Sequence, residues 1–574
     1  MDALARRLGL RTQPTIFFVS AGLMVLILAL LLLFPTQTSE VFGTGREWIV
    51  TNLGWYFIFG VTAWLVFLLF VAFGPYGQVR LGRRDDPPQY SFISWFTMLF
   101  AGGIGTILMF WGVAEPISHF STPPQADVEP YSAEAAVDAM NFALYHLSLH
   151  TWAIFALPGL AFAYFIHRYE LPVRVSSVFY PFLKEGIYGP IGRAIDITAI
   201  LGTLFGVAVS IGLGTSQIGA GLNELFGWEN GTTLKVLIIG VLTAVAVTSI
   251  VAGLDNGIKL LSNINIGMAT ALMIFVFVAG GMTLFLFREV FETLGNYLTA
   301  LPSLALWNDS LADATTEEGW SWQGGWTVFY WAWTVSWAPF MGIFLARISK
   351  GRTIREFVLG VLFAPSFFTL LWFVTFGWSA MSIDGIGGGG GEISAAVADS
   401  VPLAMFEFFE NFPGTTLLQG LTVVIVAIFF ATSADSAALV VDMLCTGDGE
   451  AGPVMQRVFW GVSQGALAAV LIIVAGDQGL EALQQVITVV GLPMFTLMFI
   501  AGIGLMIALR KENLRFVTEV HGIPDEAEAA GSDAIERGEI GYDPAEHLDD
   551  AEGATASDGR GADTGTGTGS GSRT

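Results

Sequence analysis

Two adjacent hydroxyls, Thr432 and Ser433, lie inside the long apolar run FFATSADSAALVVD, which also contains Asp435. Hydroxyl and carbonyl oxygens are the ligands that a hard cation needs, so these residues could help to bind an ion at membrane depth. Buried hydroxyls also commonly bond to the preceding turn of their own helix. An intramembrane carboxylate needs a partner or a proton, so Asp435 could be a structural cap or a functional group.

A second apolar segment, AGGIGTILMFWGVAEPISHF, contains Gly102, Gly103 and Gly105. Each glycine weakens a helix by about 1 kcal/mol relative to alanine, so the backbone can unwind here. Freed carbonyls at membrane depth persist only where they line a cavity or bind an ion. Small residues also permit close helix packing. Beside Thr432 and Ser433, unwound carbonyls would complete an oxygen-only cation site.

A third segment, FYWAWTVSWAPFMGIFLARISKGRTIREF, carries Trp331, Trp333 and Trp337 with one small hydroxyl, Thr334, among them. At helical spacing Trp333 and Trp337 share a face, whereas Trp331, Thr334 and Trp337 form a second stripe. Membrane tryptophans often anchor a helix at the interface. These rings instead continue from one end of the segment toward its middle.

The composition identifies the setting of these segments. Of the 574 residues 53% are hydrophobic and 13% are charged, and the mean hydropathy is +0.64. A chain with charges clustered between long apolar runs is typical of a helical membrane protein. The one cysteine, Cys445, excludes an internal disulfide and a cysteine-built metal site. We expect no enzyme activity, no cofactor and no nucleic-acid partner.

Twelve apolar runs are long enough to cross a bilayer, which needs about 17 residues or more. They are 15–34, 50–73, 92–113, 141–166, 195–222, 234–252, 262–287, 326–346, 357–380, 417–443, 457–475 and 484–509.

Basic residues cluster on alternate connections, and acidic residues occupy the connections between them. This asymmetry predicts a multi-pass protein of the cell membrane with both termini in the cytoplasm. The basic residues are Arg6, Arg7, Arg11, Arg80, Arg83, Arg84, His167, Arg168, Arg174, Lys184, Arg193, Arg347, Lys350, Arg352, Arg355, Arg510, Lys511 and Arg515.

Two segments are too polar to cross the membrane. Residues 288–325 have apolar residues at mixed helical spacing and predict an external amphipathic helix and loop. Residues 511–574 are acidic and end in Gly/Thr/Ser repeats, which predicts a disordered cytoplasmic tail. The tail accounts for nearly half of the net charge of −24. A role in sensing ionic conditions is the alternative to simple solvation.

The segments GGIGTILMFWGVAEP, LHTWAIF, FYWAWTVSWAPFMGIFLARISKGRTIREF and ATSADSAA together resemble the betaine/choline/carnitine transporter family. The resemblance covers most of the twelve spans. It implies a leucine-transporter-like core of two inverted five-helix repeats, 91–287 and 326–510, preceded by a segment with two extra helices, 1–90. It further implies a homotrimer and a solute site near the bilayer midplane.

The resemblance also implies an aromatic cage for trimethylammonium groups, bound by cation–π attraction. Position by position, the four cage residues are Leu147, Trp152, Phe155 and Thr334, so two rings are missing. Thr334 could instead offer a hydrogen bond to a less methylated solute. Alternatively, neighbouring Trp331 or Trp337 rebuilds the cage. Backbone N–H groups from Gly103 to Gly105 would meet the solute carboxylate.

For sodium, the resemblance implies a site of backbone carbonyls near Ala101 and Ile104, the carbonyl of Phe429, and the hydroxyls of Thr432 and Ser433. No basic residue lies between Ala194 and Leu234, which favours sodium coupling over the sodium-independent members. His146 and His150 are expected to be packing or hydrogen-bonding residues, with a proton relay as the alternative.

These expectations combine into one function, the sodium-coupled symport of a zwitterionic or quaternary ammonium solute by alternating access. Two alternatives remain open: a sodium-independent exchanger of related solutes, and an osmotic sensor with a transporter fold.

Overall fold

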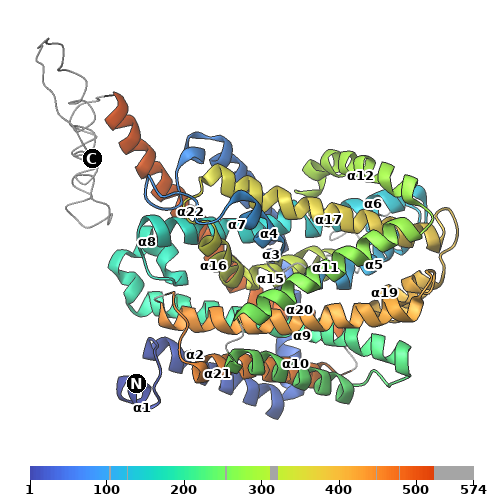
Figure 1. Ribbon diagram of the computed structural model, residues 1–574, viewed down its shortest axis with the longest axis horizontal. Helices are drawn as coiled ribbons and strands as arrows, with labels where there is room; N and C mark the ends of the chain where they lie inside the picture. Colours follow the sequence, from blue (N-terminus) through green and yellow to red (C-terminus); the bar gives the residue numbers. More distant parts are fainter. Residues whose placement is uncertain are drawn as a thin grey trace, which may run out of the picture. The chain divides into compact units, whose positions relative to one another are not determined.

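The structure is a computed structural model that describes residues 1–101, 105–125, 127–252, 255–310, 321–447, 449–476 and 479–521. In these residues the regular structure is helical, apart from an isolated antiparallel bridge between Arg80 and Thr353 (Figure 1). Residues 1–513 form one compact unit. The prediction of an all-α membrane protein is confirmed, whereas most of the predicted acidic tail lies outside the described residues.

The helices are α1 Asp2–Arg7, α2 Pro14–Leu33, α3 Pro35–Phe73, α4 Phe92–Ala101, α5 Gly105–Ser121, α6 Ala133–Leu147, α7 Leu149–Ala163, α8 Tyr180–Leu183, α9 Pro190–Phe226, α10 Thr232–Ala252, α11 Asp255–Ala279, α12 Thr283–Leu304, α14 Ser321–Gly325, α15 Thr327–Ser336, α16 Ala338–Ile348, α17 Ile354–Asp384, α18 Glu392–Asp399, α19 Ala404–Phe409, α20 Thr415–Thr446, α21 Val454–Ala475 and α22 Leu480–His521. Short 3₁₀ turns are η1 Pro75–Gln78, η3 Val175–Phe179, η4 Lys184–Tyr188 and η5 Val401–Leu403, and η2 Tyr164–Arg168 is a π-helical turn.

By length and composition, 10 helical stretches in the described residues could cross a membrane, and a bent pair brings the number to 11. The predicted third span, 92–113, corresponds to α4 and α5, which have 10 and 17 residues. Residues 102–104 between them lie outside the described residues, so unwinding there stays a prediction. Twelve crossings likewise remain a prediction.

Two predicted boundaries were wrong. Helix α3 begins at Pro35 and not at residue 50, because the helix continues through a polar stretch that lowers the hydropathy but does not break the backbone. Helix α11 ends at Ala279, and α12 begins at Thr283. Between them Gly281 has a φ of 71°, a left-handed conformation that glycine adopts readily. The apolar end of the predicted span 262–287 therefore belongs to the amphipathic helix α12.

The bent pair consists of residues 322–336, which include α15, and of α16, and the two parts are bent by 55° at the break. Pro339 lies in the first turn of α16, and because proline has no N–H it cannot donate to the carbonyl of Val335. The N–H of Trp337 instead bonds to the carbonyl of Thr334 at 3.1 Å. The predicted span 326–346 is thus broken in its middle.

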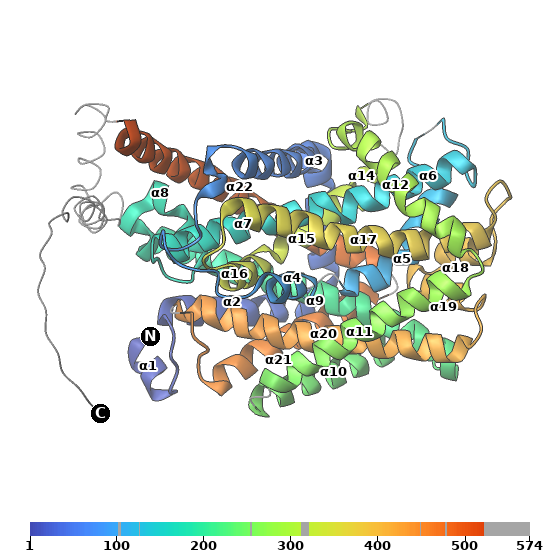
Figure 2. The same ribbon diagram turned by 45° about the horizontal axis from the view of Figure 1, so that its top comes forward.

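The helices form two groups, and the most extensive packing occurs between helices of the same group (Figure 2). In the first group, α16 and α17 pack on α7, and α5 packs on α6 and α17. In the second, α9 packs on α20 and α21, and α10 packs on α21. The amphipathic helix α12 packs against α6 and α17. Helices α5 and α15 also contact α9, so they join the two groups.

Candidate solute and sodium site

The bend between α15 and α16 is held against α9 by one hydroxyl. Trp333 and Trp337 both donate their indole N–H groups to the Oγ of Ser210, at 2.9 and 3.1 Å. The same Oγ donates to the carbonyl of Gly206 at 2.9 Å. A Cβ built on Gly206 would lie 2.9 Å from the Cβ of Ser336, which is closer than real Cβ contacts. The glycine therefore allows α15 to approach α9.

Trp331 packs against different residues from those that Trp337 contacts. Its ring stacks on His150 with centroids 5.8 Å apart and meets Tyr145 edge to face at 5.3 Å. Its indole N–H is buried and has no hydrogen-bond partner. The tryptophans thus contact different helices: Trp333 and Trp337 bond to α9, whereas Trp331 packs against α6 and α7.

The fourth predicted span, 141–166, is interrupted at Ser148, where φ is −112° and ψ is −120°. The hydroxyl of Thr151 bridges the interruption by donating to the carbonyl of His146 at 2.5 Å. Leu147 is the last residue of α6. Trp152 and Phe155 follow on α7, buried and edge to face at 5.6 Å.

Two of the predicted solute-site residues, Trp152 and Thr334, differ in their hydrogen bonding. The indole N–H of Trp152 is buried without a hydrogen-bond partner. The hydroxyl of Thr334 donates to the carbonyl of Tyr330 at 2.7 Å. A bound solute could therefore accept from Trp152, whereas Thr334 is already committed as a donor and retains only acceptor capacity.

The beginning of α5 lies against α20. A Cβ built on Gly105 would overlap the ring of Phe429, so glycine is required for this approach. Ala101 is the last residue of α4. Gly103 and Ile104 lie outside the described residues. Among the predicted sodium ligands, the structure thus describes Ala101 at the end of α4, Phe429 on α20 and the two hydroxyls that follow Phe429, whereas Ile104 is not described.

Thr432 and Ser433 are half-buried on α20, a helix that continues without interruption from Thr415 to Thr446. The hydroxyl of Thr432 donates to the carbonyls of Ile428 at 2.9 Å and Phe429 at 3.1 Å. This is the local back-bonding expected of a helical threonine. It also places the Thr432 hydroxyl and the Phe429 carbonyl, both predicted ligands, next to each other.

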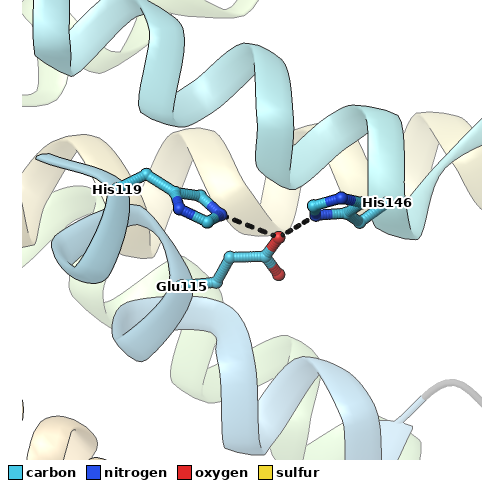
Figure 3. Close-up of side chains that lie close together, drawn as sticks. All are labelled: Glu115, His119 and His146. Atoms are coloured by element: carbon cyan, nitrogen blue, oxygen red, sulfur yellow. Dashed lines mark hydrogen bonds and ion pairs between the residues drawn. The ribbon is translucent and has the colours of Figure 1, made fainter. Parts of the chain in front are cut away.

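One polar cluster, formed by Glu115 and His119 on α5 and His146 on α6, is not among the sites predicted from the sequence (Figure 3). The sequence predicts that His146, like His150, is a packing or hydrogen-bonding residue, with a proton relay as the alternative. In the structure His146 is buried and lies at hydrogen-bond distance from Glu115 and Thr327. The signal was the four-residue spacing of Glu115 and His119, which places both on one face of a helix.

The fold and the broken helix describe a multi-pass helical membrane protein with aromatic residues at a bend inside one span. A sequence profile of the betaine/carnitine/choline family of transporters matches residues 15–514. The chain belongs to this family of membrane transporters, and the predicted resemblance is confirmed.

Three curated relatives are similar over most of their length. The ectoine/glycine betaine/proline transporter EctP of Corynebacterium glutamicum is 44% identical over 492 residues, which is 86% of this chain and 79% of the relative. Glycine betaine transporter 1 of Vibrio parahaemolyticus is 38% identical over 509 residues, 88% of this chain and 95% of the relative. A probable glycine betaine transporter of Desulfitobacterium hafniense is 38% identical over 504 residues, 88% of this chain and 99% of the relative.

Proposed function

We propose that the protein takes up zwitterionic compatible solutes, namely glycine betaine, ectoine and proline, by symport with sodium. Its membership of a transporter family and its 44% identity to a relative named for these three solutes support the substrate class. A zwitterion with a carboxylate at one end and a cationic or ring nitrogen at the other is common to all three.

The proposed architecture is the twelve-span, inverted-repeat arrangement, with both termini in the cytoplasm and a homotrimeric assembly. The 11 candidate spans, with α4 and α5 as the broken twelfth, support this count. Residues 1–90 would precede the repeats 91–287 and 326–510, with 288–325 between the repeats and 511–574 as a cytoplasmic tail. The separate packing of two helix groups supports a mechanism in which one group moves against the other.

For the solute, we place the cationic end against Trp152 and Phe155 and the carboxylate near the backbone of Gly103 to Gly105. Aromatic faces attract cations by about 0.5–2 kcal/mol per ring. With Leu147 and Thr334 at the other two cage positions, the site lacks the rings that would favour trimethylammonium over other cations. This supports a site that accepts ectoine and proline as well as glycine betaine. We also include Trp331 and Trp337 among the proposed solute-site residues.

For sodium, we place the ion between the end of α4 and the middle of α20, with ligands from Ala101, Ile104, Phe429, Thr432 and Ser433. The observation that carries this proposal is the contact of Gly105 with the ring of Phe429, which is possible only because residue 105 has no side chain. Sodium and solute would each help to order the segment that the other uses, which is the physical basis of coupling.

The test is uptake of radiolabelled solute by purified protein in liposomes. Glycine betaine, ectoine, proline, choline and carnitine would be compared, each with an inward sodium gradient and with potassium in its place. Sodium-driven accumulation of the first three supports the proposal. Uptake that needs internal counter-solute and ignores sodium would make the protein an exchanger, and binding without net uptake would make it a sensor.

A further inference from the structure

The buried cluster of Glu115, His119 and His146 has the composition of a transition-metal site. Glu115 and His119 lie one turn apart on α5, and His146 extends from α6 to meet them (Figure 3). All three side chains are at most 1% exposed. One ligand atom from each lies within 4.8 Å of the other two. Two imidazoles and one carboxylate form a common three-residue ligand set for zinc.

Two distances in the cluster bracket the ligand–ligand separation expected around a bound metal. The Oε1 of Glu115 lies 2.7 Å from Nδ1 of His146 and 3.5 Å from Nε2 of His119. Bonds of about 2.0–2.1 Å to a tetrahedral zinc give ligand–ligand separations of about 3.3 Å. We propose that this cluster binds a divalent transition metal of the zinc class, with small side-chain shifts on binding.

His119 distinguishes a metal from a shared proton. A proton between Glu115 and His146 would satisfy that pair, which lies at hydrogen-bond distance. It would leave both ring nitrogens of His119 without a hydrogen-bond partner at 1% exposure, and a buried polar group without a partner is costly. A metal bonded to Nε2 of His119 removes one of these two costs.

Two hydroxyl groups hydrogen-bond to side chains of the cluster and orient them, as the residues that hydrogen-bond to metal ligands do in known metal sites. The hydroxyl of Tyr330 donates to Oε2 of Glu115 at 2.8 Å, and the Tyr330 ring stacks on His146 with centroids 5.2 Å apart. Nε2 of His146 lies 2.9 Å from the hydroxyl of Thr327, which leaves Nδ1 facing Glu115 as the metal-binding atom. Both residues belong to α15, so a metal joining α5 to α6 would also steady the helix that carries the tryptophans.

The remaining neighbours make the site dry. His119 meets Trp326 edge to face with centroids 4.4 Å apart, and Phe142 and Trp322 lie within 5.6 Å of it. An apolar shell of this kind limits water and strengthens interactions with charge. One carboxylate and two neutral imidazoles leave a divalent ion with one positive charge, which one further anionic ligand would neutralise. His119 lies two residues before the end of α5, so the path between the proposed metal site and the loop that follows α5 is short.

Metal binding can be tested without any transport measurement. Purified full-length protein would be stripped with a chelator and titrated with Co²⁺, whose visible d–d absorption reports four-coordinate binding, and then with Zn²⁺, which should displace the cobalt. We expect one ion per chain, a rise in melting temperature with Zn²⁺, and loss of both signals in Glu115→Gln and in His119→Ala. His119→Ala is the safer variant to fold because His119 makes no hydrogen bond in the structure.

Two variants of residues that hydrogen-bond to the proposed ligands, and one control variant, sharpen the test. Tyr330→Phe and Thr327→Val keep all three ligands and should weaken Zn²⁺ binding about tenfold. His150→Gln changes a neighbouring buried histidine that lies outside the cluster and should bind metal like the wild type. The proposal is overturned if the wild type gives no cobalt spectrum, or if His119→Ala and Glu115→Gln bind metal as well as His150→Gln does. A proton shared by Glu115 and His146 is then the better description.

Discussion

Trp337 donates its indole N–H to the hydroxyl of Ser210 across 3.1 Å, at the point where α15 ends and α16 begins. Trp333, one turn earlier, bonds to the same oxygen. A single small side chain of α9 therefore fixes two large rings at the bend. Because the bend lies inside a candidate span, its position decides, under the proposed function, where aromatic surface is available to a solute.

Replacing Ser210 by alanine should destabilise the protein and weaken solute binding. Two buried indole N–H groups lose their acceptor, and each unsatisfied donor costs about 1–3 kcal/mol. The matched control is Ser216→Ala on the same helix, whose hydroxyl bonds only to the carbonyl of Gly212. Melting temperature and quenching of tryptophan fluorescence by glycine betaine would measure the two effects. Equal behaviour of the two variants would mean that Ser210 does not position the rings.

Replacing Gly105 by alanine should impair sodium-driven uptake, because the added methyl group overlaps the ring of Phe429. Overpacking of this kind costs about 1–3 kcal/mol, enough to lower uptake about tenfold. The second change Phe429→Ala should restore part of the loss by removing the ring. Gly420→Ala on α20 is the control, since a Cβ there meets no atom within 4 Å. Uptake in Gly105→Ala equal to that in Gly420→Ala would argue against the proposed close approach.

Removing the hydroxyls of Thr432 and Ser433 should raise the sodium concentration needed for half-maximal uptake. A hydrogen bond or ligand contact to a charged group contributes about 1.5–3 kcal/mol, so the double alanine variant should need at least about tenfold more sodium. Thr432→Ser keeps an oxygen at the same position and should remain close to the wild type. Initial rates of uptake at increasing sodium provide the measurement, and an unchanged sodium dependence would remove both hydroxyls from the site.

Introducing tryptophan at Thr334 and at Leu147 should shift selectivity toward glycine betaine. Each added ring contributes about 0.5–2 kcal/mol to a bound quaternary ammonium group. Both positions are buried, so the melting temperature of each variant must be measured beside its affinity. Competition between glycine betaine and ectoine for uptake gives the readout, because ectoine has no trimethylammonium group. An equal change in affinity for the two solutes would show that these positions do not contact the cationic end of the solute.

Much of the fold could be predicted because span length and apolar composition are local properties of the sequence. Helices α9, α10, α17 and α21 coincide with predicted spans to within several residues. Interruptions were harder to predict. The break at Ser148 has no glycine or proline beside it, and it depends on the hydroxyl of Thr151 reaching back to His146. Nothing in the hydropathy profile marks such a contact.

The sequence alone determined that this protein is a helical membrane protein of the betaine/carnitine/choline family, because long apolar runs and family motifs are read directly from neighbouring residues. Only the tertiary structure decided which of those residues meet. Ser210 lies well over a hundred positions from Trp337, and Glu115 lies 31 positions from His146. Their contacts arise from the packing of helices against one another. Helical spacing within one segment indicates which face of the helix a residue occupies, but not which other helix packs against that face.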